Sequence, residues 1–247
     1  MYAHNLHRHL VGALAAPRLA AGILVILGLL SPACGDPDPG VVMPALQPAV
    51  ANFAILANAA VTCTNGSVTG DVGTYLAAPT GAVTLTSSQV VGTIHVGDAV
   101  AAQAFKRFAA GYAALTPQPG DGCTVLTGTL AGVTLSPGAY CFDAAATLTG
   151  VLTLNGPATG IWTFKIGTIG TGALTGTNLS MVMTGGGQAC NVTWWVAQAA
   201  TMTTSDFKGN ILAGAGITVT GGTFNGNAWA KADATNTGTT GTGCPSK

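Results

Sequence analysis

Short runs in which apolar and polar residues alternate fill most of the chain after residue 126, for example at 133–135, 151–154 and 192–196. Turns that contain glycine separate these runs. Alternation with a period of two, bounded by turn residues, is typical of β-strands with one buried face. A similar strand-like stretch lies at 52–64. The chain is therefore expected to be mainly β.

A tandem repeat predicts how these strands are arranged. Residues 201–217 (TMTTSDFKGNILAGAGI) are followed at once by 218–234 (TVTGGTFNGNAWAKADA), and a third copy opens at Thr235. The offset is 218 − 201 = 17 and again 235 − 218 = 17 residues. Repeats built from helix pairs need about 34 residues or more. One coil of a parallel β-solenoid fits the shorter period, because each coil buries its apolar side chains against the next.

Thr-x-Thr pairs recur through these expected coils, mostly with an apolar residue in the centre. Alternation places central residues such as Leu148, Met202 and Val219 in the core, and both flanking threonines outside on one face. The candidate site consists of Thr62, Thr64, Thr147, Thr149, Thr175, Thr177, Thr201, Thr203, Thr218, Thr220, Thr235 and Thr237. Stacking would bring equivalent threonines to about 4.8 Å from one another. Threonine is also a common outward strand residue, so the pairs alone do not establish a role.

A single helix is expected over residues 98–115. Asp98 is a good N-cap, and Pro117 lies just beyond the end. One apolar stripe at helical spacing connects them, formed by Val100, Ala104, Phe105, Phe108, Tyr112 and Leu115. A helix with one apolar side must pack against something, most simply the flank of the solenoid, with Val100, Ala104, Phe108 and Tyr112 facing inward.

The N-terminus has the features of an export signal. An apolar run at 19–30 is too short to span a bilayer and suits the centre of a signal peptide. Cleavage near Ala33 would release a secreted protein from a signal of residues 1–33. Alternatively, Cys34 is lipidated, residues 34–48 are a Pro/Gly-rich tether, and the protein is held at the cell surface with no other membrane contact. Residues 49–247 form the expected folded domain in either case.

Composition narrows the possible functions. Only 6% of the residues are charged, against about 25% in a typical globular domain, and the formal net charge is +0 with no basic patch. Nucleic acid is therefore not an expected partner.

The cysteines suit an oxidising compartment. We expect disulfides between Cys123 and Cys141 and between Cys63 and Cys244, with Cys190 as a small buried thiol. Asn236, the centre of the last Thr-x-Thr pair, suits a terminal coil whose core is partly open.

The sequence contains little that could support catalysis. His95 is the one histidine beyond the export signal. The residues needed for a histidine metal cluster or for a nucleophile activated by histidine are therefore not in place. There is no glycine-rich phosphate loop, and Asp71 suits a turn residue that binds backbone amides. We expect neither an enzyme nor a cofactor, and a carbohydrate-active β-solenoid enzyme is the least supported alternative.

Seven segments, taken in order, resemble the DUF3494-type family of ice-binding proteins. They are 51–56 (ANFAIL), 68–73 (VTGDVG), 92–99 (GTIHVGDA), 135–140 (LSPGAY), 161–166 (IWTFKI), 188–194 (QACNVTW) and 207–212 (FKGNIL). The resemblance covers about residues 49–240. It implies a discontinuous right-handed parallel β-solenoid with one long α-helix packed alongside. In this sequence two features depart from the family pattern: residues 170–178 look longer than a usual coil, and Asp233 places a charge beside Thr235.

The resemblance also implies a function. Family members adsorb to ice crystals through one flat solenoid face, which here would be the threonine pairs. The expected protein is an exported monomer that adsorbs to ice and limits ice growth or recrystallisation. A cell-surface β-solenoid that mediates adhesion or matrix contact without ice activity is the main alternative, and ice shaping would separate the two.

Overall fold

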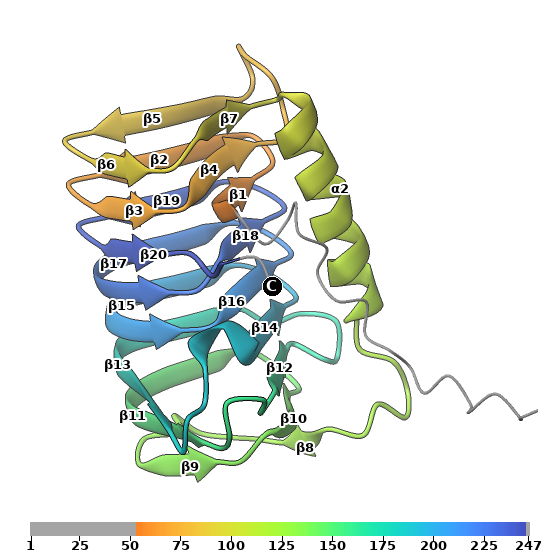
Figure 1. The fold of residues 1–247 in the computed structure, drawn as a ribbon. Coiled ribbons are helices and arrows are strands. Elements are labelled where there is room, and N and C mark those ends of the chain that lie inside the picture. Colours follow the sequence, from red (N-terminus) through yellow and green to blue (C-terminus); the bar gives the residue numbers. More distant parts are fainter. Residues whose placement is uncertain (1–52, 246–247) are drawn as a thin grey trace, which may run out of the picture. The chain divides into compact units, whose positions relative to one another are not determined.

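The computed structural model describes residues 53–245 and contains, within that range, one α-helix and a stack of parallel β-coils (Figure 1). The expected fold, a mainly β parallel solenoid with a single helix alongside, is confirmed. The predicted export signal (1–33), the linker (34–48) and Cys34 lie outside the described residues. In the described part of the chain no helix is long and apolar enough to cross a membrane.

Each coil of the stack contributes to three faces, which we name by what covers them. The threonine face is formed by β5 (Ala82–Thr86), β2 (Ala60–Thr64), β19 (Ala234–Thr237) and the first halves of β17 (Ile217–Asn225), β15 (Ala200–Lys208), β13 (Leu174–Thr184) and β11 (Ala146–Asn155). The mixed face is formed by β6 (Gln89–Val91), β3 (Ser67–Thr69), β20 (Thr240–Thr242), the second halves of the same four long strands, and β9 (Val133–Leu135).

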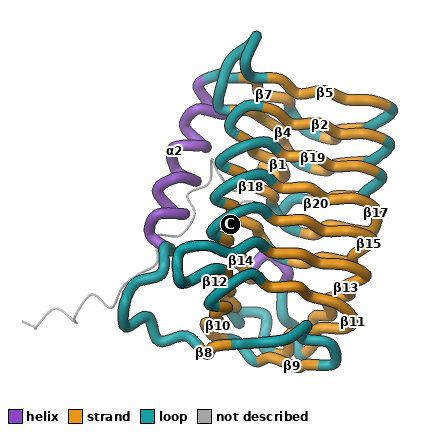
Figure 2. Tube along the Cα trace, turned by 180° about the vertical axis from the view of Figure 1, so that it is seen from behind, coloured by secondary structure: helices purple, strands orange, loops and turns teal. Residues whose placement is uncertain are grey.

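The helix face is a separate sheet of nine strands, against which α2 (Ala99–Ala114) packs (Figures 1 and 2). In spatial order its strands are β7 (Ile94–Val96), β4 (Asp71–Thr74), β1 (Phe53–Ala57), β18 (Ala228–Ala230), β16 (Asn210–Ala213), β14 (Val192–Val196), β12 (Trp162–Ile166), β10 (Gly138–Phe142) and β8 (Thr124–Val125). A short 3₁₀ turn, η1 (Ala189–Asn191), leads into β14.

The order of the coils in space differs from their order in the chain. The two coils built from β2–β4 and β5–β7 stack on the C-terminal end of the solenoid, because β2 pairs with β19. The coil at this junction, which we call the seam coil, takes β19 and β20 from the C-terminal end and β1 from the N-terminal end. The solenoid is therefore discontinuous in the chain, and both described ends meet in one coil.

The interior confirms the predicted alternation and corrects one expectation. Leu148, Met202, Ile217 and Val219, all predicted to point inward, are at most 5% exposed. The prediction for Asn236 is wrong: its coil is not terminal, because β2 covers β19 from the other side, and the residue is only 5% exposed.

In each of the seven coils from β5 to β11, the turn from the threonine face to the mixed face begins with a residue in the left-handed conformation. These residues are Ser87, Asn65, Gly238, Gly221, Thr204, Asn178 and Gly150, with φ between 48° and 70°. Glycine and asparagine adopt this conformation at least cost, which explains why Gly or Asn follows so many of the Thr-x-Thr pairs. The bend lets one continuous strand such as β15 serve two faces.

The helix is placed largely as predicted. Asp98 is the N-cap, and its Oδ1 accepts a hydrogen bond from the Ala101 amide at 2.8 Å. The predicted residues Ala104, Phe108 and Tyr112 are buried, whereas Val100 is 47% exposed, so its inward placement is wrong. Steps of four residues advance a helix by about 40° beyond a full turn, and this drift turns Val100 away from the side that Ala101 occupies.

Two disulfides lie within residues 53–245: Cys123–Cys141, as expected, and Cys190–Cys244. The expected Cys63–Cys244 bond is therefore wrong, and so is the interpretation of Cys190 as a free thiol. Cys63 is free and buried, because alternation along β2 points it into the core. Cys244 follows β20 at the corner of the stack, where its Cα lies 5.5 Å from that of Cys190.

Candidate functional site

The threonine face carries two files of threonines in direct register. In spatial order the first file is Thr84, Thr62, Thr235, Thr218, Thr201, Thr175 and Thr147. The second file is Thr86, Thr64, Thr237, Thr220, Thr203 and Thr177. Thr149 follows in the next coil, where the pairing of β11 with β13 shifts between Leu148 and Gly150. Thr203 and Thr220 were predicted to lie on neighbouring strands, and the structure confirms that they are direct partners on β15 and β17.

All fourteen threonines of this face are exposed or half-buried. The residues between each pair, such as Met202 and Val219, point into the core and fix the strand beneath. Neighbouring strands lie about 4.8 Å apart, and alternate residues along a strand about 6.6 Å apart. The seven coils of the first file therefore extend over roughly 6 × 4.8 ≈ 29 Å. The result is a regular two-dimensional array of one side-chain type.

Sequence reasoning missed one coil of this array. Thr84 and Thr86 lie on β5 and pair directly with Thr62 and Thr64. The signal was present, because Thr84-Leu85-Thr86 is another Thr-x-Thr pair with an apolar centre.

The segment at 170–178 does not disturb the register. Thr175 and Thr177 pair with Thr201 and Thr203 as in the other coils. The turn before β13, where Ile169 is 78% exposed, lies outside both files. The threonine face is therefore regular across this segment.

Asp233, the charge beside Thr235, is not part of either file. It precedes β19 at the corner of its coil, and its Oδ1 accepts a hydrogen bond from the Ala60 amide at 2.9 Å. Asp71 acts in the same way, since its Oδ1 accepts from the Thr93 amide at 2.9 Å. Both carboxylates join successive coils through backbone amides. The predicted amide binding of Asp71 is confirmed, but the residue begins β4 and does not lie in a turn.

The mixed face has the same spacing but no uniform file. One row across it, in spatial order, contains Gln89, Ser67, Thr240, Thr223, Asp206, Ser180 and Val151. Thr223 donates a hydrogen bond from its hydroxyl to Asp206 Oδ1 at 2.8 Å. An amide, a carboxylate and an apolar side chain interrupt the hydroxyl groups of this row, so among the described residues the regular array is confined to the threonine face.

The titratable side chains near α2 hold the helix in place. His95 Nδ1 lies 2.6 Å from Asp98 Oδ2 at the start of the helix. Lys165 pairs with Asp121 in the segment that follows the helix. Within residues 53–245, no group of three or more His, Cys or Asp side chains is placed to hold a metal ion.

Several known proteins share this sequence and fold. A model of the family described as Ice-binding-like matches residues 55–240. An ice-binding protein of Nostoc sp. (strain HG1) is 38% identical over 177 residues, which cover 68% of this chain and 61% of that protein. An ice-binding protein of Flavobacterium frigoris (strain PS1) is 33% identical over 187 residues, which cover 68% of this chain and 65% of that protein. The matched segments thus span less than two thirds of both relatives.

The fold agrees with a solved structure. The crystal structure of an ice-binding protein from the Antarctic ascomycete Antarctomyces psychrotrophicus superposes with a TM-score of 0.69 at 30% identity, covering 81% of this chain and 96% of that one. With the family match over most of the described residues, this chain belongs to the Ice-binding-like family.

Proposed function

We propose that this protein binds ice through the threonine face. The observation that carries the proposal is the pair of threonine files in direct register across the coils from β5 to β13. The names of the relatives point the same way, since the matched proteins from Nostoc and Flavobacterium are ice-binding proteins.

The physical basis is an array of rigid groups that can order water. Each threonine offers a hydroxyl that binds a water molecule and a methyl group that excludes one, and its χ1 angle is stiff. The strands beneath are held by buried side chains such as Met202 and Val219, so little conformational entropy remains to be lost on adsorption. The files themselves contain no charged residue that would orient water differently.

The remaining parts of the proposal concern the setting of this activity. The protein acts as an exported monomer, either secreted or anchored through a lipid at Cys34, and it adsorbs to ice without catalysis. Ice is its partner through the threonine face, and no cofactor takes part.

The test places a bulky ring on the face without touching the core. Thr203→Tyr and Thr220→Tyr sit in adjacent coils near the middle of the second file. Ice adsorption, measured as ice shaping and thermal hysteresis in a nanolitre osmometer, should fall at least several-fold. The free energy of unfolding should change by only about 0.5 kcal/mol, as for other surface substitutions.

Two matched variants control for the added ring. Asn225→Tyr lies on β17, the strand that carries Thr220, but on the mixed face. Lys106→Tyr lies on the exposed side of α2. Both should shape ice like the wild type. Unchanged ice shaping in the two threonine variants would reject this face as the adsorption surface, and glycan binding without any ice shaping would favour the adhesion alternative.

A further inference from the structure

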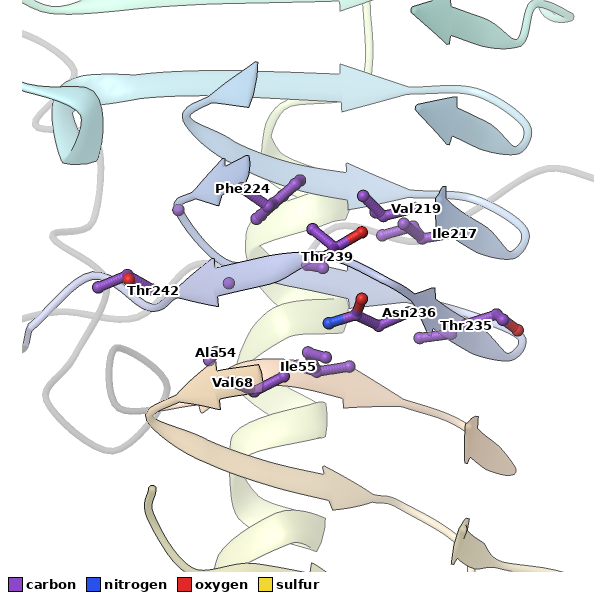
Figure 3. Close-up of a pocket in the computed structure, with 14 residues that line it drawn as sticks. Ala54, Ile55, Val68, Ile217, Val219, Phe224, Thr235, Asn236, Thr239 and Thr242 are labelled. Carbon is purple, nitrogen blue, oxygen red and sulfur yellow. The ribbon is translucent and has the colours of Figure 1, made fainter. Parts of the chain in front are cut away.

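A small cavity lies inside the solenoid at the seam coil. Phe207 and Phe224 occupy equivalent inward positions in two successive coils, with ring centroids 5.3 Å apart. The seam coil places Gly241 at the same position, in register with Phe224. The missing side chain leaves a space of about 20 Å³ for the centre of a water molecule (Figure 3). One water needs roughly 10–15 Å³ by this measure.

One polar side chain in this cavity has an unsatisfied atom. Asn236 lines the cavity, is 5% exposed, and its buried Oδ1 has no hydrogen-bond partner within the described residues. The coils above and below place Val219 and Cys63 at the equivalent position. A buried amide oxygen without a partner is costly, and in native structures such groups are usually satisfied by protein or by ordered water.

A second acceptor faces the same space. Thr239 also lines the cavity and is 1% exposed. Its Oγ1 lies 3.3 Å from the carbonyl oxygens of both Gly221 and Thr237, which share its one hydrogen. The lone pairs of Oγ1 are left to accept a hydrogen bond. Most of the remaining lining is apolar, from residues such as Ile55 and Val68 (Figure 3).

We infer that the seam coil binds one buried water molecule, which donates its two hydrogens to Asn236 Oδ1 and Thr239 Oγ1. The cavity has the required volume, and the two acceptors meet the lower limit of polar partners for a buried water. The inference does not depend on ice binding. The water would lie directly beneath the threonine face, because Asn236 is the inward residue between Thr235 and Thr237. The water completes the hydrogen bonding of the coil in which both ends of the described chain meet.

Two substitutions in the full chain test this site. Asn236→Val removes one acceptor and introduces the residue that the neighbouring coil already has at Val219. Gly241→Ala places a methyl group in the cavity without a clash, since its Cβ would lie 3.6 Å from Ser67 O and 3.9 Å from Asn236 Nδ2. Gly122→Ala is the control, because a Cβ there meets nothing within 4 Å.

The measurement is the number of long-lived internal waters, counted by ¹⁷O magnetic relaxation dispersion. The wild type and Gly122→Ala should give the same number, and Asn236→Val and Gly241→Ala should each give one fewer. A crystal structure of the wild type should show a water about 3 Å from both acceptor oxygens. An equal count in Asn236→Val and the wild type, or an empty cavity in the electron density, would overturn the inference. A water retained in Gly241→Ala would reject its placement in this cavity.

Discussion

The threonine face and the helix face are built on the same coils, yet they leave their outward side chains in opposite situations. In the coil formed by β17 and β18, Thr220 points outward on one face and Trp229 on the other. Thr220 is exposed, whereas Trp229 is fully buried, 6.2 Å from the Phe108 ring between centroids, and donates its indole hydrogen to Phe53 O at 2.8 Å. The coil geometry sets the spacing on both faces, and the outward residue type decides whether a face packs or remains free.

The length of the helix matches the part of the sheet that needs covering. A helix of 16 residues is about 24 Å long, and the five strand spacings from β7 to β14 also amount to about 24 Å. From β1 to β14 the outward residues under it are large and apolar, namely Leu56, Trp229, Leu212 and Trp195. Gly73 and His95 hold the equivalent positions on β4 and β7. Beyond β14 the outward residues become Lys165 and Cys141, and the segment after α2 binds them through Asp121 and Cys123.

The largest expected effect comes from opening the helix face. Trp229→Ala should lower the free energy of unfolding by about 3–5 kcal/mol, because it leaves a large cavity between sheet and helix. Urea or thermal unfolding monitored by circular dichroism measures this loss. Thr220→Ala, on the other face of the same coil, should change it by less than about 0.5 kcal/mol. Similar losses of unfolding free energy in both variants would contradict the view that the helix face stabilises the fold and the threonine face does not.

The sequence predicted those features that depend on local alternation. The inward placement of Leu148, Met202 and Val219 follows from a period of two, and the 17-residue repeat predicts the register of β15 with β17. The Asp98 cap and the inward Phe108 follow from helical spacing in the same way. These properties are encoded within a few residues, so no knowledge of distant contacts was needed.

What the sequence did not predict depends on contacts between distant segments. The strands at 82–96, with Thr84 and Thr86, were also missed. Residues 82–86 (AVTLT) repeat 60–64 (AVTCT), but the offset of 82 − 60 = 22 residues differs from the 17-residue period. The pairing of β19 with β2 joins segments more than 170 residues apart, and no local pattern reports it. The partner of Cys244 follows from that arrangement, which explains why Cys63 was chosen wrongly.

A smaller effect is expected at the corner between the threonine face and the mixed face. Thr204 is β-branched and has φ = 48°, whereas Asn65 and Asn178 hold the equivalent corner position. A left-handed conformation costs an ordinary residue about 1–2 kcal/mol, and asparagine tolerates it better. Thr204→Asn should therefore stabilise the protein by about 0.5–1 kcal/mol in chemical denaturation. Thr203→Asn, one residue earlier and in extended strand, should give no gain, and neither change should alter the coil register.

The smallest expected effect is a pH dependence of stability that arises at the start of α2, on the helix face, and not on the threonine face. Partial burial alone raises the pKa of Asp98, but hydrogen bonds from the Ala101 amide and from His95 outweigh it, and the pKa of this carboxyl is lowered. A lowered pKa in the folded state stabilises above the unfolded value of about 3.9, and that contribution is lost as pH falls through the folded value. Because the Asp98 carboxylate is exposed to solvent, the pair contributes less than about 1 kcal/mol.

Asp98→Asn keeps a residue that caps helices well but removes the charge. The difference in unfolding free energy between wild type and Asp98→Asn should therefore shrink as pH falls below about 4, which urea titrations at several pH values measure. The two threonine files contain no ionisable side chain, so ice adsorption by the folded wild type should not follow the same pH dependence. A stability difference that stays constant from pH 5 to pH 2.5 would contradict the lowered pKa of Asp98. Ice adsorption that falls in parallel with it would show that the threonine face depends on the anchoring of the helix.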